Sequence, residues 1–296
     1  SSYHYLENRT NFDEFIKKIN PEVLMLHVCI PGDQLVIPAS MNKLKHLIIN
    51  DREFNGLNLS GLILNSIVSK RKVLNASFET RKIKILGNVE ISHLPQVWSN
   101  LEMLKLVVDT IPPIFTDKNF PALKKLYLDV QNQNGANNLR SLTKLESLIV
   151  KGPVYSNQID APGLKRLDIS SAKIDRLPPS LCKRIEILVP CNMSAWDLLY
   201  FENLKVLHSG DMLVSRIETF LEKSNGKELP ISTLIISKTE FAAMKPEVID
   251  RANLKKIFPR FMYLHIFDRF NDGNPIVREF NRLYQQVTDQ TTADFI

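Results

Sequence analysis

A short apolar phrase recurs along this chain of 296 residues and constrains its fold more than any other feature. Aliphatic residues occupy the first, fourth and sixth positions of the phrase, as in Leu123, Leu126 and Leu128. Its copies begin at Leu44, Leu101, Leu123, Leu145, Leu164, Cys182, Leu204 (without the sixth position), Ile231 and Phe261. From Leu104 onward the middle residues are 18 to 30 residues apart. Self-similarity at such a period indicates a repeat architecture.

Each copy of the phrase predicts a short strand with one apolar face. Alternate side chains of a strand face opposite sides, so Leu126 and Leu128 point one way while Tyr127 and Asp129 point the other. A single short strand cannot bury its apolar face alone. Parallel stacking of successive copies buries a continuous row of aliphatic side chains, which predicts a solenoid.

Residues 101–188 resemble the leucine-rich repeat superfamily of the irregular intracellular type. The resemblance is carried by three successive copies, 121–128, 142–150 and 162–169, and by Leu177-Pro178 in the following return segment. It implies an α/β solenoid, with a curved parallel sheet on the concave face and helices, 3₁₀ or extended segments on the convex face. The chain departs from the family pattern after the third leucine, where Val108, Val130 and Ser170-Ser171 replace the usual Asn or Cys.

The solenoid is expected to fill residues 23–270, with helical caps at 1–22 and 271–296 and ten to twelve repeats. Both caps contain apolar residues at helical spacing, and helices are also expected near 212–223 and 240–250. The early strands are expected around Leu26, Leu62 and Ile83, although the step from Leu47 to Leu62 is only 15 residues.

Composition favours one domain in a reducing compartment. The chain is 44% hydrophobic with only ten glycines, so a linker is not evident. The three cysteines lack the clustered pairing of secreted repeat proteins. Residue 1 begins no signal peptide and no apolar stretch is long enough to span a membrane. We therefore expect a cytoplasmic or nuclear protein without a membrane partner, and the start without Met suggests that a further N-terminal module is missing.

The charge balance is basic, with a net charge of +6 and a pI of about 9.1. Lysine and arginine are dispersed along the repeats and form no compact block interleaved with aromatic residues. Solvated repeat surfaces account for this pattern, so we expect a protein partner rather than nucleic acid.

Outward strand residues form the predicted binding face, because the concave side of a solenoid surrounds its partner. One predicted patch centres on Tyr127, and a second lies on the strand near residue 264, with Ile235 beside it. The candidate partner-binding residues are Lys105, Lys125, Tyr127, Asp129, Ile149, Lys151, Arg166, Asp168, Tyr263, His265 and Phe267. The alternative is that the aliphatic members only satisfy β-propensity, and that the terminal segment covers Phe267.

Catalysis is not expected. The sequence contains no Gly-x-Gly-x-x-Gly, Walker, His-Glu-x-x-His or Gly-x-Ser-x-Gly motif, and its six histidines are dispersed. We therefore expect no catalytic residue, no metal and no cofactor.

The leading hypothesis is non-enzymatic protein recognition. The irregular repeats also resemble those of F-box proteins, which implies a substrate receptor that contacts a ubiquitin-ligase adaptor through a missing F-box-type module. Two alternatives are an effector that targets a host or rival protein and a basic factor associated with chromatin or nucleic acid, whose affinity would fall steeply with salt.

Overall fold

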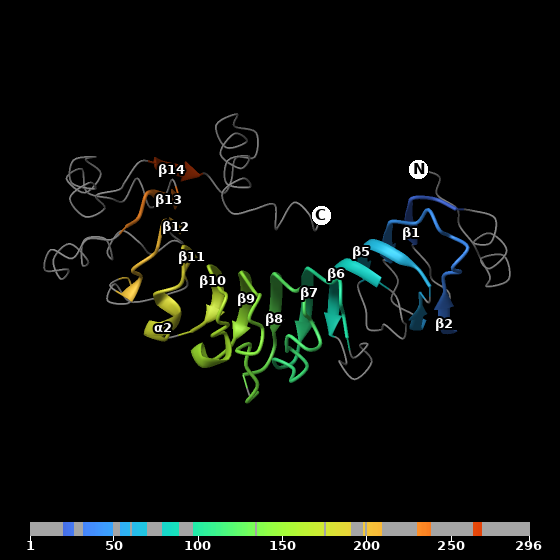
Figure 1. Ribbon diagram of the computed structural model, residues 1–296, viewed down its shortest axis with the longest axis horizontal. Helices are drawn as coiled ribbons and strands as arrows, with labels where there is room; N and C mark the ends of the chain where they lie inside the picture. The colour runs from blue at the N-terminus through green and yellow to red at the C-terminus, as the bar shows by residue number, and fades with distance from the viewer. Residues whose placement is uncertain are drawn as a thin grey trace, which may run out of the picture. The chain divides into compact units, whose positions relative to one another are not determined.

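The computed structural model describes residues 20–26, 32–49, 54–59, 61–69, 79–88, 97–133, 135–174, 176–190, 198, 200–208, 230–237 and 263–267 (Figure 1). The chain divides into two compact units, Ser1–Lys144 and Leu145–Ile296. Each unit is described by itself below.

Parallel strands dominate the first unit. They are β1 (Val23–Leu26), β2 (Gly32–Val36), β3 (His46–Ile49), β4 (Phe54–Asn58), β5 (Ile63–Ser69), β6 (Glu79–Asn88), β7 (Met103–Val108) and β8 (Lys125–Val130). The main sheet follows the order β1-β3-β5-β6-β7-β8 with parallel pairing, and β2 pairs with β4 in a separate parallel ladder. β2 and β4 are thus extended return segments between strands of the main sheet.

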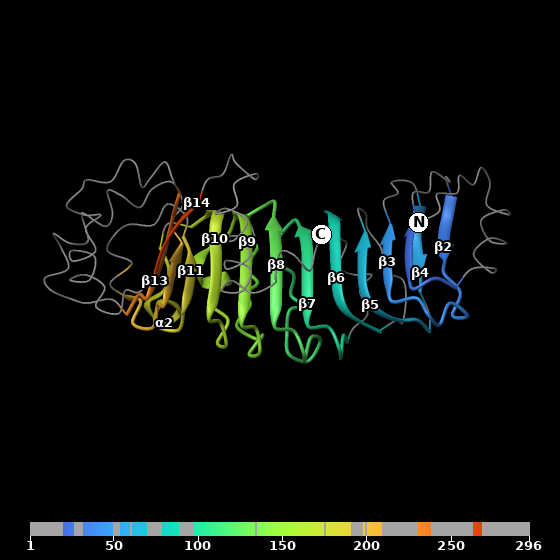
Figure 2. The same cartoon turned by 90° about the horizontal axis from the view of Figure 1, so that it is seen from above.

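The second unit repeats this plan. Its elements are β9 (Ser147–Pro153), the 3₁₀ helix η2 (Ser156–Gln158), β10 (Arg166–Lys173), the helix α2 (Pro179–Cys182), β11 (Ile187–Val189), β12 (Val206–His208), β13 (Thr233–Ser237) and β14 (Tyr263–Phe267). Strands β9 to β14 pair in sequence order and in parallel, and Figure 2 shows β9, β10 and β11 side by side. Each unit is therefore solenoid-like.

One residue per strand forms a continuous column along each sheet, and we call these the register residues. They are Leu24, Leu47, Ile67, Ile83, Leu104 and Leu126 in the first unit, and Leu148, Leu167, Leu188, Leu207, Leu234 and Leu264 in the second. Those whose side chains are described are at most 6% exposed. Aliphatic burial between stacked strands thus forms the core, as predicted.

The predicted register is wrong at β11. The sequence phrase places Ile185 in the middle of this copy, with Ile187 inward and Leu188 outward. In the structure Leu188 pairs with Leu167 and Leu207 and is fully buried, whereas Ile187 is only partly buried. The one-turn helix α2 takes up Cys182, so Ile185 closes the turn and the strand begins two residues later.

Two earlier registers also differ from the prediction. Leu24 replaces Leu26 as the register residue of β1, and Ile67 replaces Leu62 in the copy that forms β5. The step from Leu47 then becomes 20 residues rather than 15, which removes the irregularity. Leu62 lies instead in the turn before β5, where its N–H donates to the Leu59 carbonyl over 3.1 Å.

Several of the turns before the strands share one hydrogen-bond pattern. In these turns the first leucine of a phrase donates its N–H to the carbonyl of a buried residue three positions earlier, as Leu101 does to Trp98 at 3.3 Å and Leu123 to Phe120 at 3.3 Å. This bond turns the chain into the strand. The buried residue before the phrase adds a core position that the predicted pattern lacks.

A second type of hydrogen bond links consecutive coils, where one coil is a strand of the main sheet with the return segment that follows it. The carbonyl two residues before a register residue accepts two N–H groups of the next coil: Glu102 accepts from Lys124 at 2.9 Å and from Lys125 at 3.0 Å. Glu186 likewise accepts from Lys205 and Val206. The hydrogen bonding between neighbouring parallel strands therefore begins just before the first residue of each strand.

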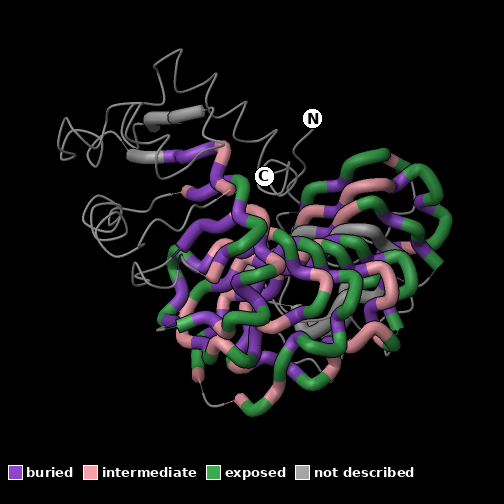
Figure 3. The backbone as a smooth tube through the Cα atoms, turned by 60° about the vertical axis from the view of Figure 1, so that its left-hand side comes forward, coloured by how far each residue is buried: buried purple, intermediate pink, exposed green. Residues whose placement is uncertain are grey.

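Figure 3 shows buried positions interspersed with partly exposed and exposed ones along the part of the backbone that is coloured by burial. Strand β8 alternates strictly, with Leu126, Leu128 and Val130 buried and the residues between them partly exposed. We call the sheet face that carries these intervening residues the open face of each unit.

The solenoid expectation is confirmed at the level of stacked parallel strands. The return segments in the described part of the chain include the extended β2 and β4, the 3₁₀ helix η2 and the helix α2, which spans only four residues. The expected helices near 212–223 and 240–250, and most of the cap at 1–22 with all of the cap at 271–296, lie outside the described residues.

Candidate functional site

The open face of the first unit carries an aromatic side chain covered by a cation. Lys105 of β7 and Tyr127 of β8 are register partners, and the Lys105 Nζ lies 4.1 Å from the centroid of the Tyr127 ring. This separation is well within the range of a cation–π interaction. The structure thus brings together Tyr127, the centre of the first predicted patch, and Lys105, one of the predicted basic residues around it.

The remaining first-unit candidates surround this pair. Lys125 precedes and Asp129 follows Tyr127 at two-residue spacing on β8, and all three side chains are partly exposed. The carboxylate of Asp129 accepts a hydrogen bond from Gln131 Nε2 at 2.8 Å. Next to Lys125 in the strand register is Met103, which is only 3% exposed although it faces the same side.

Ile149, Lys151, Arg166 and Asp168 belong to the second unit, where β9 and β10 pair. Ile149 is the register partner of Asp168, and Lys151 is the partner of Ser171 because β10 contains a bulge after Asp168. The bulge explains why Ser170 and Ser171 are both exposed. It occupies the place where the resembled family usually has Asn or Cys.

The bulge also fixes the Asp168 carboxylate. Asp168 Oδ1 accepts hydrogen bonds from the Ser170 N–H at 3.0 Å and from the Ser170 hydroxyl at 2.8 Å. Burial raises the pKa of Asp168, while the two bonds from Ser170 and the charge of Lys151 oppose the rise. The site is therefore a partly buried carboxylate that a local turn holds in place beside a lysine.

Arg166 lies at the start of β10, in register with Ser147 and Ile187. Its positive charge acts on the Glu186 carboxylate, which precedes β11. The hydrogen bond from Lys205 lowers the pKa of Glu186 most, and the charges of Lys205, Lys165 and Arg166 add to this effect. Arg166 therefore lies at the start of β10, close enough to the Lys205–Glu186 ion pair to affect the pKa of Glu186.

The second predicted patch is only partly placed. Tyr263, His265 and Phe267 pair in register with Thr233, Ile235 and Ser237, respectively. The three side chains of β14 lie outside the described residues. Ile235, which the sequence analysis added to this patch, is 1% exposed and belongs to the buried residues.

A charged row, which the sequence analysis missed, precedes the strands of the second unit. The residues two positions before the register residues alternate between negative and positive charge along the sheet: Glu146, Lys165, Glu186 and Lys205. The Lys205 Nζ is 2.6 Å from the Glu186 Oε2. The alternation is visible in the sequence once the register of β11 is corrected.

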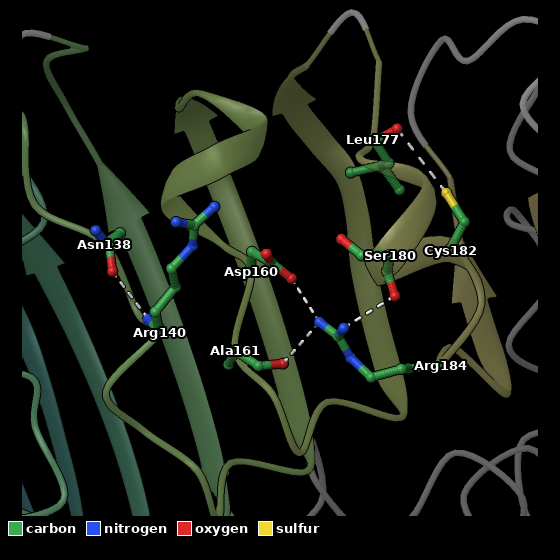
Figure 4. A network of polar contacts seen from close by, with 8 residues as sticks. All are labelled: Asn138, Arg140, Asp160, Ala161, Leu177, Ser180, Cys182 and Arg184. Atoms are coloured by element: carbon green, nitrogen blue, oxygen red, sulfur yellow. Dashed lines mark hydrogen bonds and ion pairs between the residues drawn. The ribbon is translucent and has the colours of Figure 1, made fainter.

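Arg184 forms a second missed network, on the turn side of the second unit (Figure 4). Its guanidinium donates to the Ser180 carbonyl at 2.9 Å, to Asp160 Oδ1 at 2.5 Å and to the Ala161 carbonyl at 3.3 Å. It thereby ties α2 to the preceding coil. The 24-residue separation of Asp160 and Arg184, about one repeat, is the only sequence signal for the pair. We assign this network to stability.

The described residues contain no group of three or more His, Cys, Asp or Glu that could hold a metal ion. Within the same part of the chain, no helix is long and apolar enough to cross a membrane. No protein-family model matches the chain, and a search of curated proteins returns no significant match.

Proposed function

We propose that the chain is a non-enzymatic recognition module that binds another protein through the open face of the first unit, centred on Tyr127. The observation that carries this proposal is the partly exposed Tyr127 ring with Lys105 Nζ 4.1 Å from its centroid. Tyrosine is enriched among the side chains that dominate binding energy at interfaces.

The core does not require this aromatic residue. Leu126 and Leu128, on either side of Tyr127, are 2% and 0% exposed and supply the apolar contacts of β8 on the other face. Tyr127 favours a strand but is not needed to fill the interior. A large aromatic group held at a fixed place outside the core is well suited to a contact surface, because little side-chain freedom remains to be lost on binding.

The open face of the second unit is proposed as a further contact region. Ile149 and Asp168 are adjacent there in the strand register, and Lys151 and Arg166 provide positive charge on the same two strands. Tyr263, His265 and Phe267 extend this proposal to β14 through their register positions. The narrower expectation, a substrate receptor of an F-box-type ubiquitin ligase, stays a prediction.

Affinity purification with quantitative mass spectrometry tests the proposal. The test variant is Tyr127→Ala with Lys125→Glu, and the control is Tyr155→Ala with Lys118→Glu, which makes the same substitutions at exposed positions outside the strands. We expect specific partners to fall about tenfold with the test variant and to persist with the control, because loss of a central contact residue typically costs at least about 1–2 kcal/mol.

Both variants must retain the circular dichroism spectrum and unfolding midpoint of the wild type. Partners that the test variant and the control capture equally would contradict binding at Tyr127. Tyr263→Ala with His265→Ala, assayed in the same way, examines the β14 region separately.

A further inference from the structure

Four side chains on the open face of β11, β12 and β13 are buried, although alternation along a strand directs them away from the core. Val189, Val206, Thr233 and Ile235 are 8%, 7%, 8% and 1% exposed, respectively. Each is next to a register residue in its strand, so it points to the face opposite the column of register residues. A face of a sheet becomes buried when a further layer packs on it. The open face is therefore covered along these three strands.

The cover does not extend over β9 and β10. Ile149 and Ile235 occupy equivalent places in their strands, one residue after the register residue, yet Ile149 is partly exposed and Ile235 is almost fully buried. In β9 and β10 the short Ser147 is the only described open-face side chain that is buried. Neighbouring strands alone therefore do not bury an isoleucine at this place, and β13 has an additional layer above it.

Topology identifies the segment that can form this layer. A return segment between two adjacent parallel strands crosses over the core face, where it covers the register residues. Residues 268–296 follow β14, the last strand of the second unit in the described part of the chain, and are not tied to such a crossover. These 29 residues lie outside the described residues, and they are the segment whose connectivity leaves the open face accessible to it.

The sequence after β14 predicts an amphipathic helix of suitable length. Asn274 and Pro275 are typical of a helix start. Apolar residues then recur at helical spacing, at Ile276, Phe280, Leu283, Tyr284 and Val287. A helix over 275–287 is about 20 Å long, whereas β11 to β14 span about 14 Å at a strand spacing of about 4.8 Å. Residues 268–274 reach about 23 Å when extended, which is enough chain for a reversal over the sheet.

We propose that residues 268–296 fold back over the open face of β11–β13, with the apolar side of the 275–287 helix against Val206 and Ile235. Apolar burial on both sides stabilises this contact. The segment closes this part of the face, so a partner gains access there only by displacing it. β9 and β10 stay accessible, and the binding proposed at Tyr127 does not depend on the segment.

Thiol labelling of the full chain with a maleimide tests this contact. Thr233→Cys introduces a thiol of similar size under the proposed cover, and Ser171→Cys introduces one at an exposed position of β10. Peptide mass spectrometry follows the labelling of each thiol separately. The native Cys182 is fully buried and reports unfolding of the second unit in the same sample.

Each thiol is compared in three backgrounds. One is the wild-type segment, and the second carries Phe280→Asp with Leu283→Asp on the apolar side of the expected helix. The third carries Asn281→Asp with Gln285→Asp, which adds the same charge on the polar side. Because each site is compared with itself, the intrinsic reactivity of its thiol cancels.

We expect the apolar-side pair to speed labelling of Thr233→Cys at least about tenfold and the polar-side pair to change it by less than about twofold, because only the first removes the cover. Labelling of Ser171→Cys and of Cys182 should stay within about twofold in every background. If the aspartates make Cys182 reactive, Phe280→Ala with Leu283→Ala replaces them, with the same expected order of rates.

Two results would overturn the inference. Equal labelling of Thr233→Cys with the apolar-side and polar-side pairs would assign the cover to a return segment. A labelling rate that rises when the wild-type background is diluted would assign it to a second copy of the chain. The experiment contains no partner protein, so either result leaves the proposal for Tyr127 untouched.

Discussion

Replacing Leu188 or Ile187 by alanine tests the strand register on which the second unit depends. The two residues are neighbours on β11, but Leu188 is fully buried between Leu167 and Leu207, whereas Ile187 is partly exposed on the open face. The sequence phrase assigns the opposite orientation to both. The pair therefore distinguishes the structure from the sequence pattern with a minimal change in chemistry.

Burial sets the expected magnitudes. Leu188→Ala removes a side chain from the column of register residues and leaves a cavity between stacked strands, which costs about 2–5 kcal/mol in packed cores. Ile187→Ala removes a side chain that is only partly buried, so the loss should be about 1 kcal/mol. Each coil of a solenoid contacts only its neighbours, so the cavity cannot be relieved by distant rearrangement.

Urea unfolding followed by circular dichroism measures the difference. We expect Leu188→Ala to lower the midpoint by roughly 1 M or more, given slopes of about 1–3 kcal/mol/M, and Ile187→Ala to lower it by a fraction of that shift. The slope should be compared as well, because a repeat array can lose cooperative unfolding. A larger loss for Ile187→Ala than for Leu188→Ala would refute the register of β11 and the column of leucines with it.

Two further predictions concern backbone strain and pH. Gly61 has φ +80°, and an added Cβ would lie 3.2 Å from the Ala39 Cβ. Gly61→Ala should therefore lower the free energy of unfolding by about 1–3 kcal/mol, measured in thermal or urea melts. An unchanged melt would contradict the expected strain in this turn. Burial raises the pKa of Asp168, so the folded state holds the proton more tightly than the unfolded state, and stability should fall as pH rises from the ordinary Asp pKa through the raised value. Asp168→Asn should remove this fall, which unfolding titrations at a series of pH values would detect as a flatter profile in that window.

The apolar phrase alone determines a large part of the fold. Its alternation of apolar and other residues predicts the buried side chains of β8, and those of β10 up to the bulge after Asp168. It also predicts Leu104, Leu126, Leu148 and Leu167 as middle residues, and the strand pairing confirms all four. The alternation is local and strong because misplacing one residue would expose a whole apolar row. The same alternation places Lys105, Lys125 and Tyr127 on the open face.

Tertiary structure decided the strand register where more than one apolar residue of a copy could serve as its middle residue. At β11, Ile185, Ile187 and Leu188 all qualify, and only pairing with Leu167 and Leu207 selects Leu188. Pairing of Leu47 with Ile67 corrects β5 in the same way. The alternating row from Glu146 to Lys205 depends on that register, because its members are close only across strands.

The sequence therefore determined the face that side chains take in a regular strand such as β8, since alternation acts within a few residues. The structure decided which residues of different coils become neighbours, since that depends on the length and path of every return segment. Short return segments such as those with α2 and η2, and the bulge after Asp168, change the number of residues in a coil. The spacing of apolar residues within each copy does not reveal these changes. Cross-strand chemistry, including the stack of Lys105 on Tyr127, follows only once those paths are known.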